Sequence, residues 1–185
     1  MRKATLLFII LLIGSLGFSQ NAPINFEPGG FGDSFTWATF ETPMGEVDPT
    51  LTVVANPDMS GINTSANVAK FEVTYASTAN WGQAGCETMH GADVGTFMVT
   101  AANSHVRMQI YQVGFASPVA VKFATDQSAA FAETVVSNTV ADAWVEVIFD
   151  MSGWIGSTLP GNLDQFIFFP SYAPRGGGHV VYFDN

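Results

Sequence analysis

The sequence predicts an all-β protein built as an antiparallel β-sandwich of two sheets. Segments rich in aromatic and β-branched residues alternate between apolar and polar side chains, which is typical of strands with one buried face. Turn-forming residues recur at short intervals between these segments. No stretch keeps a helical period long enough to form a helix. Many short strands joined by such turns favour a sandwich.

Nine segments carry the strand signal in chain order. Each is short, and most place apolar residues at every second position. They span residues 35–41, 51–55, 68–76, 105–113, 118–124, 133–140, 144–150, 165–170 and 180–185. Cys86, which follows Gly85, is expected to open a further strand.

The alternation predicts which side chains of these strands face the core. The inward set in residues 105–110, 118–124 and 144–150 is Val106, Met108, Ile110, Val119, Val121, Phe123, Val145, Val147 and Phe149. The outward set is Arg107, Gln109, Tyr111, Lys122, Glu146 and Ile148. We expect Lys122 to lie on the strand next to Arg107, so that both cations share one face.

The N-terminus has the pattern of a secretory signal peptide. Arg2 and Lys3 precede the apolar run "ATLLFIILLIG", and the small residues Gly17 and Ser19 suit cleavage after Ser19. The apolar run is short for a membrane span. We therefore expect residues 1–19 to be a signal peptide, residues 20–185 to form a single domain, and the protein to be secreted or held at the cell surface.

The charge balance disfavours polyanionic partners. Sixteen acidic residues stand against six lysines and arginines, two of which lie in the predicted signal peptide. The resulting field repels nucleic acid and anionic membranes. One cysteine cannot form an internal disulfide, so stability must come from core packing, with or without a bound ion.

Four stretches carry a family resemblance: "INFEPGG", "VVANPDMSGINTSANVAKF", "SNTVADAWVEVIFDMSG" and "VVYFDN". The chain resembles a jelly-roll module of secreted Bacteroidota proteins, similar to carbohydrate-binding modules with a galactose-binding-like fold, from about Ile24 to Asn185. The resemblance implies glycan binding, a structural calcium ion and no catalysis. The resembling modules run one short strand past "YFDN", so a natural protein that continues after Asn185, with a catalytic partner domain, is one arrangement the chain allows.

The calcium ion of the resembling modules ties the first strand to the last. The matching positions here are Glu27, the loop "DMSGIN" and Asp184. Asp58, Ser60 and Asn63 add oxygens beside the loop carbonyls, and calcium takes six to eight oxygen ligands. The alternative is an ordinary turn rich in Asp and Asn between paired terminal strands.

A sugar-binding face is expected around the outward side of residues 105–113. Arg107, Gln109 and Tyr111 lie there, Lys122 follows on the next strand, and Trp81 precedes a strand where it could project over a groove. Aromatic rings stack on sugars, and the polar side chains bind hydroxyl groups. The alternative is that Trp81 packs into the core while Arg107 and Lys122 pair with acidic neighbours.

The stretch "GCETMHGAD" gathers Cys86, Glu87, His90 and Asp93. Zinc needs three or four converging ligands, and a cysteine nucleophile needs a nearby base, but an extended strand separates Cys86 from His90. We expect a buried, unreactive Cys86. Glu87 and His90 remain candidate ligand contacts at the edge of the sandwich.

These observations favour a secreted, non-catalytic module that binds a polysaccharide or oligosaccharide. One alternative is a small glycoside hydrolase or polysaccharide lyase on the same fold, which would need two carboxylates or a Tyr/His pair in one cleft. The other is an adhesion or surface-structure module with a flat outer face.

Overall fold

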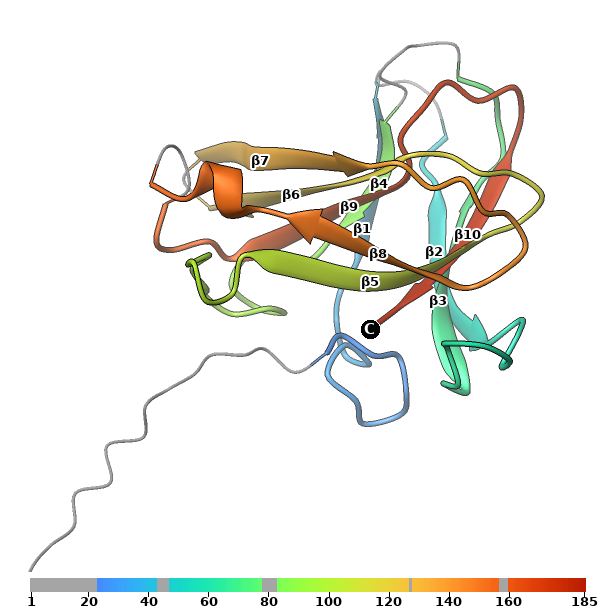
Figure 1. Ribbon diagram of the computed structural model, residues 1–185, viewed down its shortest axis with the longest axis horizontal. Coiled ribbons are helices and arrows are strands. Elements are labelled where there is room, and N and C mark those ends of the chain that lie inside the picture. Colours follow the sequence, from blue (N-terminus) through green and yellow to red (C-terminus); the bar gives the residue numbers. More distant parts are fainter. Residues whose placement is uncertain (1–22, 43–46, 78–82, 127, 157–159) are drawn as a thin grey trace, which may run out of the picture.

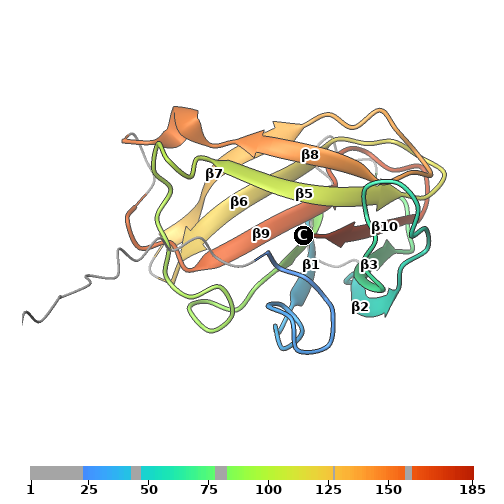
Figure 2. The same cartoon turned by 60° about the horizontal axis from the view of Figure 1, so that its bottom comes forward.

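The computed structural model describes residues 23–42, 47–77, 83–126, 128–156 and 160–185. Ten strands in these residues form two five-stranded antiparallel sheets (Figures 1 and 2). The first sheet contains, in spatial order, β1 (Ala38–Thr42), β4 (Gln83–Glu87), β9 (Gln165–Ser171), β6 (Val119–Thr125) and β7 (Ser128–Val136). The second contains β2 (Thr50–Ala55), β3 (Asn67–Val73), β10 (His179–Asp184), β5 (His105–Gln112) and β8 (Val145–Asp150).

The predicted two-sheet β-sandwich is confirmed. Within the described residues the helical structure is one short 3-10 turn, η1 (Ser152–Trp154), and no helix there has the length and apolar character needed to cross a membrane.

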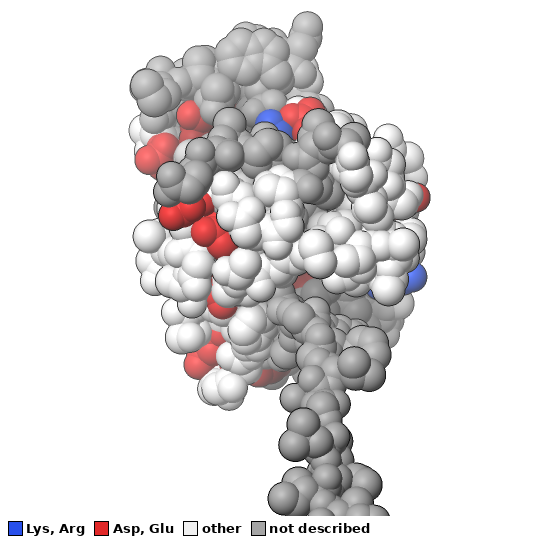
Figure 3. All heavy atoms as spheres, turned by 90° about the vertical axis from the view of Figure 1, so that its left-hand side faces the viewer, with Lys and Arg blue, Asp and Glu red and all other residues white. Residues whose placement is uncertain are grey.

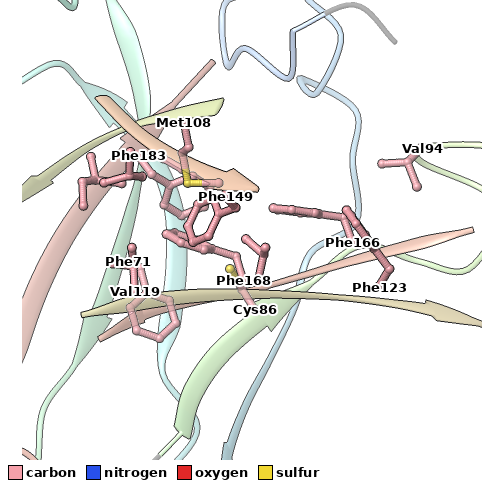
Figure 4. Close-up of a cluster of buried hydrophobic side chains, with 14 of the residues drawn as sticks. Phe71, Cys86, Val94, Met108, Val119, Phe123, Phe149, Phe166, Phe168 and Phe183 are labelled. Atoms are coloured by element: carbon pink, nitrogen blue, oxygen red, sulfur yellow. The ribbon is translucent and has the colours of Figure 1, made fainter. Parts of the chain in front are cut away.

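Apolar side chains from both sheets meet in one core (Figure 4). Met108 and Phe183 come from the second sheet, and Cys86, Phe123 and Phe168 come from the first. The predicted inward residues all pack here, although Val106 and Val145 are only partly buried. Burying this aromatic and aliphatic surface is the main contribution to the stability of the fold.

Most connections carry the chain from one sheet to the other. Only β2–β3 and β6–β7 are hydrogen-bonded neighbours that are also consecutive in the chain. Residues 113–118 lead from β5 in the second sheet to β6 in the first. Strands that are adjacent in the sequence therefore present their outward side chains on opposite sides of the molecule.

The first described residues, 23–26, lie beside the end of β10 in the second sheet. The backbone N–H of Asn185, just after β10, donates to the carbonyl of Ile24 at 3.1 Å. Phe26 is buried and contacts the Phe183 ring edge-on at 5.6 Å. This pairing brings Glu27 and Asp184 to one corner of the sandwich.

A buried ion pair occupies the core near the opposite end of the first sheet. Arg175 donates from Nη2 to Glu41 Oε1 at 3.0 Å, and both side chains are almost fully enclosed. The Arg175 guanidinium also lies 5.8 Å from the Tyr75 ring. Removing one partner of such a pair is costly because the other charge is left buried.

Candidate functional site

The outer face of the second sheet carries polar and aromatic side chains, some exposed and some partly buried. Arg107, Gln109 and Tyr111 all point outward there, as predicted. Arg107 donates to Glu146 at 2.9 Å, and both side chains are about half exposed. The Tyr111 ring contacts Tyr182 edge-on at 6.0 Å. We call this surface the β5 face.

Lys122 does not share this face, so the predicted grouping of Lys122 with Arg107 is wrong. Lys122 points outward from β6, which belongs to the first sheet. The crossover at residues 113–118 places the two cations on opposite outer faces of the sandwich. Period-two alternation identifies the side of a strand that faces outward, but it does not identify the sheet to which the strand belongs.

The outer face of the first sheet is unusual because it is apolar. Ala120, Ala124, Ile167 and Phe169 point outward, yet they form a second buried cluster. Phe40 and Tyr172 pack against them and are partly exposed. The outward faces of sheets in a monomer are normally polar, so a buried outward apolar cluster with an aromatic rim is informative.

Charged groups border this cluster. The Lys122 ammonium group lies 5.1 Å from the centre of the Phe169 ring and 2.6 Å from Glu133. The Tyr172 hydroxyl donates to the other oxygen of Glu133 at 2.6 Å. Burial raises the pKa of the Glu133 carboxyl, but these two hydrogen bonds outweigh burial and hold the pKa below its ordinary value. Glu133 is therefore ionised and its acceptor sites are largely used.

Glu87 differs from Glu133 because no described residue donates a hydrogen bond to it. Glu87 is paired in register with Ile167 across β4 and β9, so its side chain lies on the same apolar face. Burial raises its pKa, and the charge of nearby His90 partly offsets that rise. A half-buried carboxylate without a donor is an open acceptor for a ligand hydroxyl. We call the surface formed by Ala120, Lys122, Ala124, Ile167 and Phe169 with Phe40, Glu87, Glu133 and Tyr172 the β6–β9 face.

The remaining polar residues after β4 bind their own loop and neighbouring segments, including the residue before β9. Asp93 accepts the backbone N–H of Met89 at 2.7 Å, and His90 Nδ1 lies 2.8 Å from Asp164. Cys86 is fully buried, as expected, and burial raises the pKa of its thiol well above the ordinary value. The described residues contain no group of three His, Cys, Asp or Glu arranged to hold a metal.

Trp81, the predicted stacking residue, lies outside the described residues. It precedes β4 by two positions, and β4 belongs to the first sheet.

Two of the predicted calcium ligands, Glu27 and Asp184, lie at one corner, where residues 24–27 run beside the end of β10. Asp184 is buried; its Oδ2 accepts from Asn63 at 3.2 Å, while its Oδ1 is buried without a partner. Burial raises the pKa of Asp184, hydrogen bonds from Ser65, Asn63 and Asn185 partly offset that rise, and the like charge of Glu27 adds a smaller increase. An orphaned carboxylate oxygen near a second carboxylate is the kind of arrangement that a hard cation stabilises.

The other predicted ligands are arranged less favourably. Asn63 presents its amide nitrogen, a donor, to Asp184, and its oxygen accepts from Asn56 and Ser65. Asp58 accepts the backbone N–H of Ser60 at 2.9 Å in a tight turn, and Ser60 is exposed. No interaction links Asp58 or Ser60 to the carboxylates of Glu27 and Asp184. Asp184 is thus the residue that fits a cation best, with Glu27 beside it, although the Glu27 carboxylate already accepts from Asn67 at 3.1 Å and 2.7 Å.

Sequence reasoning missed most of the β6–β9 face. Phe40, Phe169 and Tyr172 were not among the predicted site residues, and Glu133 was not expected beside Lys122. A signal was present in "QFIFFP", because an unbroken apolar run indicates a strand that is covered on both faces. The other contacts join residues far apart in the chain and have no local signature.

The surface charge matches the composition. On the side of the molecule shown in Figure 3, acidic side chains are spread over the surface, basic atoms are few, and most of the area between them is uncharged. A neutral ligand meets no long-range repulsion there, in contrast to a polyanion.

Several solved structures resemble this fold. A family 28 carbohydrate-binding module specific for non-crystalline cellulose has a TM-score of 0.56 at 14% identity, with 87% of this chain and 90% of that chain covered. A variant of a family 29 carbohydrate-binding module has a TM-score of 0.50 at 13% identity, with 89% and 87% covered. These likenesses show the fold alone.

A structure of carbohydrate-binding modules from the β-sandwich superfamily has a TM-score of 0.49 at 16% identity. The match covers 89% of this chain but 60% of that chain. No protein-family model matches the sequence, and no curated protein matches it significantly.

Proposed function

We propose that this chain is a secreted, non-catalytic carbohydrate-binding module that binds a polysaccharide across the β6–β9 face. The observation that carries the proposal is the partly exposed aromatic pair Phe40 and Tyr172, which lies over the buried outward cluster of the first sheet beside the open acceptor Glu87 and Lys122. Ligand sites are typically apolar and aromatic with a few convergent polar groups. The β5 face is more polar, because Arg107 and Glu146 are about half exposed there, although Tyr111, Tyr182 and Trp144 form an aromatic cluster beside them.

The chemistry of this face suits a sugar. The partly exposed rings of Phe40 and Tyr172 offer apolar surface to the C–H groups of a pyranose ring. Glu87 can accept a hydrogen bond from a sugar hydroxyl, and Lys122 can donate a hydrogen bond through a second N–H while it remains paired with Glu133. The acidic surface favours a neutral polysaccharide over a polyanionic one.

The fold supports the same function class. The family 28 module that it resembles is specific for non-crystalline cellulose, and the family 29 structure is also a carbohydrate-binding module. A similar fold at this sequence identity does not identify the glycan, so the proposal depends on the residues of the β6–β9 face.

Affinity electrophoresis against a panel of neutral and acidic polysaccharides tests the proposal. Glu87→Gln keeps the shape of the side chain and removes its charge, and Lys122→Ala removes the donor. Each should weaken retention by about tenfold or more, because a hydrogen bond to a charged group contributes roughly 1.5–3 kcal/mol. Arg107→Ala on the β5 face is the matched control and should retain parental binding.

The opposite pattern would overturn the assignment of the site. If Arg107→Ala weakens retention while Glu87→Gln and Lys122→Ala do not, the ligand lies on the β5 face. If no polysaccharide in the panel retards the parent protein, the carbohydrate-binding proposal itself fails.

We also propose that calcium binds at the corner held by Glu27 and Asp184. Bound there, the ion would neutralise two carboxylates and give Asp184 Oδ1 the partner that it lacks. Backbone carbonyls would have to complete the coordination, since calcium takes six to eight oxygens.

Thermal unfolding with added calcium and with chelator tests the cation site. Calcium should raise Tm in the parent protein, because a ligand that binds only the folded state stabilises it by mass action. Asp184→Asn should abolish the response, whereas Asp58→Asn should keep it, since Asp58 folds onto its own turn. An identical Tm with calcium and with chelator in the parent would rule the site out.

A further inference from the structure

Two side-chain oxygens on the outer face of the second sheet are buried and have no hydrogen-bond partner. They are Oδ1 of Asp184 on β10 and Oε1 of Gln109 on β5. The two strands are neighbours (Figure 2), and their register pairs Asp184 directly with Gln109. The residues that flank them in each strand, Phe183, Met108 and Ile110, point into the core, so both polar side chains lie on the outer face.

This juxtaposition is unusual because both atoms are acceptors. An ionised carboxylate and an amide oxygen cannot donate to each other, and buried acceptors in proteins nearly always have a donor. Each unpaired acceptor costs stability in the folded state. A cation that contacts both oxygens would remove both costs at once.

The surroundings of Asp184 leave Oδ1 as its open position. Its other oxygen, Oδ2, accepts from Asn63 Nδ2 at 3.2 Å and from Asn185 Nδ2 at 3.1 Å. Asn63 lies in the loop between β2 and β3, and Asn185 follows β10. Two segments therefore hold the carboxylate in place through one oxygen, and the other oxygen remains available to a ligand.

Glu27 is the other carboxylate of this corner, and its oxygens are already used. Oε1 accepts the backbone N–H groups of Ala66 and Asn67, and Oε2 accepts from Asn67 Nδ2 at 2.7 Å. The charge of Glu27 still acts on Asp184. The unpartnered oxygens of the described residues at this corner therefore lie on β10 and β5, and not on the segment that carries Glu27.

We propose that the cation of this corner binds between Asp184 Oδ1 and Gln109 Oε1, so that it links β10 to β5. Glu27 then contributes its charge rather than a ligand oxygen. This inference rests on the calcium site proposed above and assigns the ligands within it. Calcium takes carboxylate and side-chain amide oxygens together with backbone carbonyls and water. An all-oxygen pair suits calcium, magnesium or manganese better than zinc or copper.

Isothermal titration calorimetry of the full chain with calcium chloride, after treatment with chelator, tests this assignment. Gln109→Leu keeps a similar size and removes the oxygen. Its calcium affinity should fall about tenfold or more, because affinity follows the number and charge of the ligands. Gln109→Glu restores the oxygen and adds a charge, so it should bind calcium at least as tightly as the parent.

Thermal unfolding separates a ligand role from a structural one. In chelator, Gln109→Leu should keep the parental Tm, because it removes no hydrogen bond to that oxygen. Gln109→Glu should unfold at a lower Tm than the parent in chelator, since two carboxylates then lie side by side, and added calcium should remove that deficit.

Two further variants serve as controls in the calorimetry. Tyr111 lies two positions after Gln109 on the same face of β5, and Tyr111→Phe removes a hydroxyl that the proposal does not use, so it should bind calcium as the parent does. Glu27→Gln removes a nearby charge but no ligand, so it should weaken calcium binding by only about threefold.

Failure of this assignment can be told apart from failure of the cation site. Calcium that does not bind the parent overturns both. If Asp184→Asn abolishes calcium binding while Gln109→Leu keeps parental affinity, the cation site stands and Gln109 is not its ligand. The assignment also fails if Glu27→Gln weakens binding as much as Gln109→Leu does. Should Gln109→Leu not fold, Gln109→Glu still decides, because calcium affinity below the parental value contradicts the proposal.

Discussion

Gln112 is a polar residue that points into the core from β5. Both polar atoms of its side-chain amide have hydrogen-bond partners. Its Nε2 donates to the carbonyls of Ser117 and Pro170, at 3.2 Å and 3.0 Å. Its Oε1 accepts from the Ser117 N–H and from Asn138 Nδ2, both at 2.8 Å. One side chain thus ties the crossover at residues 113–118 to β9 and to the segment after β7.

Replacing Gln112 tests how much this hydrogen-bond network contributes to the free energy of unfolding. Gln112→Leu keeps a similar size but leaves buried carbonyls and N–H groups unpaired, so the free energy of unfolding should fall by about 3 kcal/mol. Urea unfolding measures the change. Gln109→Leu is the control on the same strand, because the Gln109 Oε1 is also buried but has no partner, so the substitution removes no hydrogen bond to that oxygen. That variant should stay within about 0.5 kcal/mol of the parent, and an equal loss in both would contradict the role of the network.

At the scale of strands, the sequence predicted which side of each strand is buried but not which sheet the strand joins. Val147 and Phe149 are buried and Ile148 is exposed, as the alternation predicts. The placement of Lys122 beside Arg107 failed because residues 113–118 cross between sheets. Alternation reports local burial, whereas sheet membership depends on hydrogen bonds between segments far apart in the chain.

Because contacts between distant segments are not visible in the local sequence, only some of the site residues could be predicted. Glu27 and Asp184 were identified from a resemblance, and the structure brings them to one corner. Asn63 joins them with its donor group rather than its oxygen, a detail set by its bonds to Asn56 and Ser65. The β6–β9 face combines side chains from β1, β4, β6, β7 and β9, and no local pattern connects these strands.

Gly85 is required where β1 and β4 pack under the rim of the β6–β9 face. A Cβ at this position would lie 2.5 Å from the tip of the Phe40 ring and 3.0 Å from the Phe168 carbonyl oxygen. Gly85→Ala should therefore push Phe40 off the sheet and lower the free energy of unfolding by about 1–3 kcal/mol. The loss should shrink in a Phe40→Ala background, which a double-mutant cycle by urea unfolding measures.

Gly153→Ala provides the control for that cycle. A Cβ on Gly153 meets no atom within 4 Å, so the substitution should change stability by less than about 0.5 kcal/mol. If Gly85→Ala lowers the free energy of unfolding equally in the parent and in the Phe40→Ala background, a clash with the Phe40 ring is not the reason that position 85 requires glycine.

At the scale of the whole molecule, His179 links the two sheets. It lies at the start of β10, stacks on the Phe115 ring of the crossover at 3.6 Å, and places Nδ1 2.8 Å from the Ser171 hydroxyl at the end of β9. Burial lowers the pKa of His179, and the positive charge of Arg175 lowers it further. The folded protein therefore holds this imidazole neutral under conditions in which the unfolded chain is protonated.

The sign of the resulting pH dependence follows from proton binding. The unfolded state takes up a proton at His179 near pH 6.5, while the folded state does so only at lower pH. The stability that neutral His179 contributes is complete above about pH 7 and is lost as the pH falls through the folded pKa. Urea unfolding of the parent and of His179→Gln should show a difference in stability that is constant between about pH 7.5 and 9 and shrinks toward pH 5.5. A difference that grows on acidification would mean that the folded protein prefers a charged His179, contrary to its burial against Phe115 and Arg175.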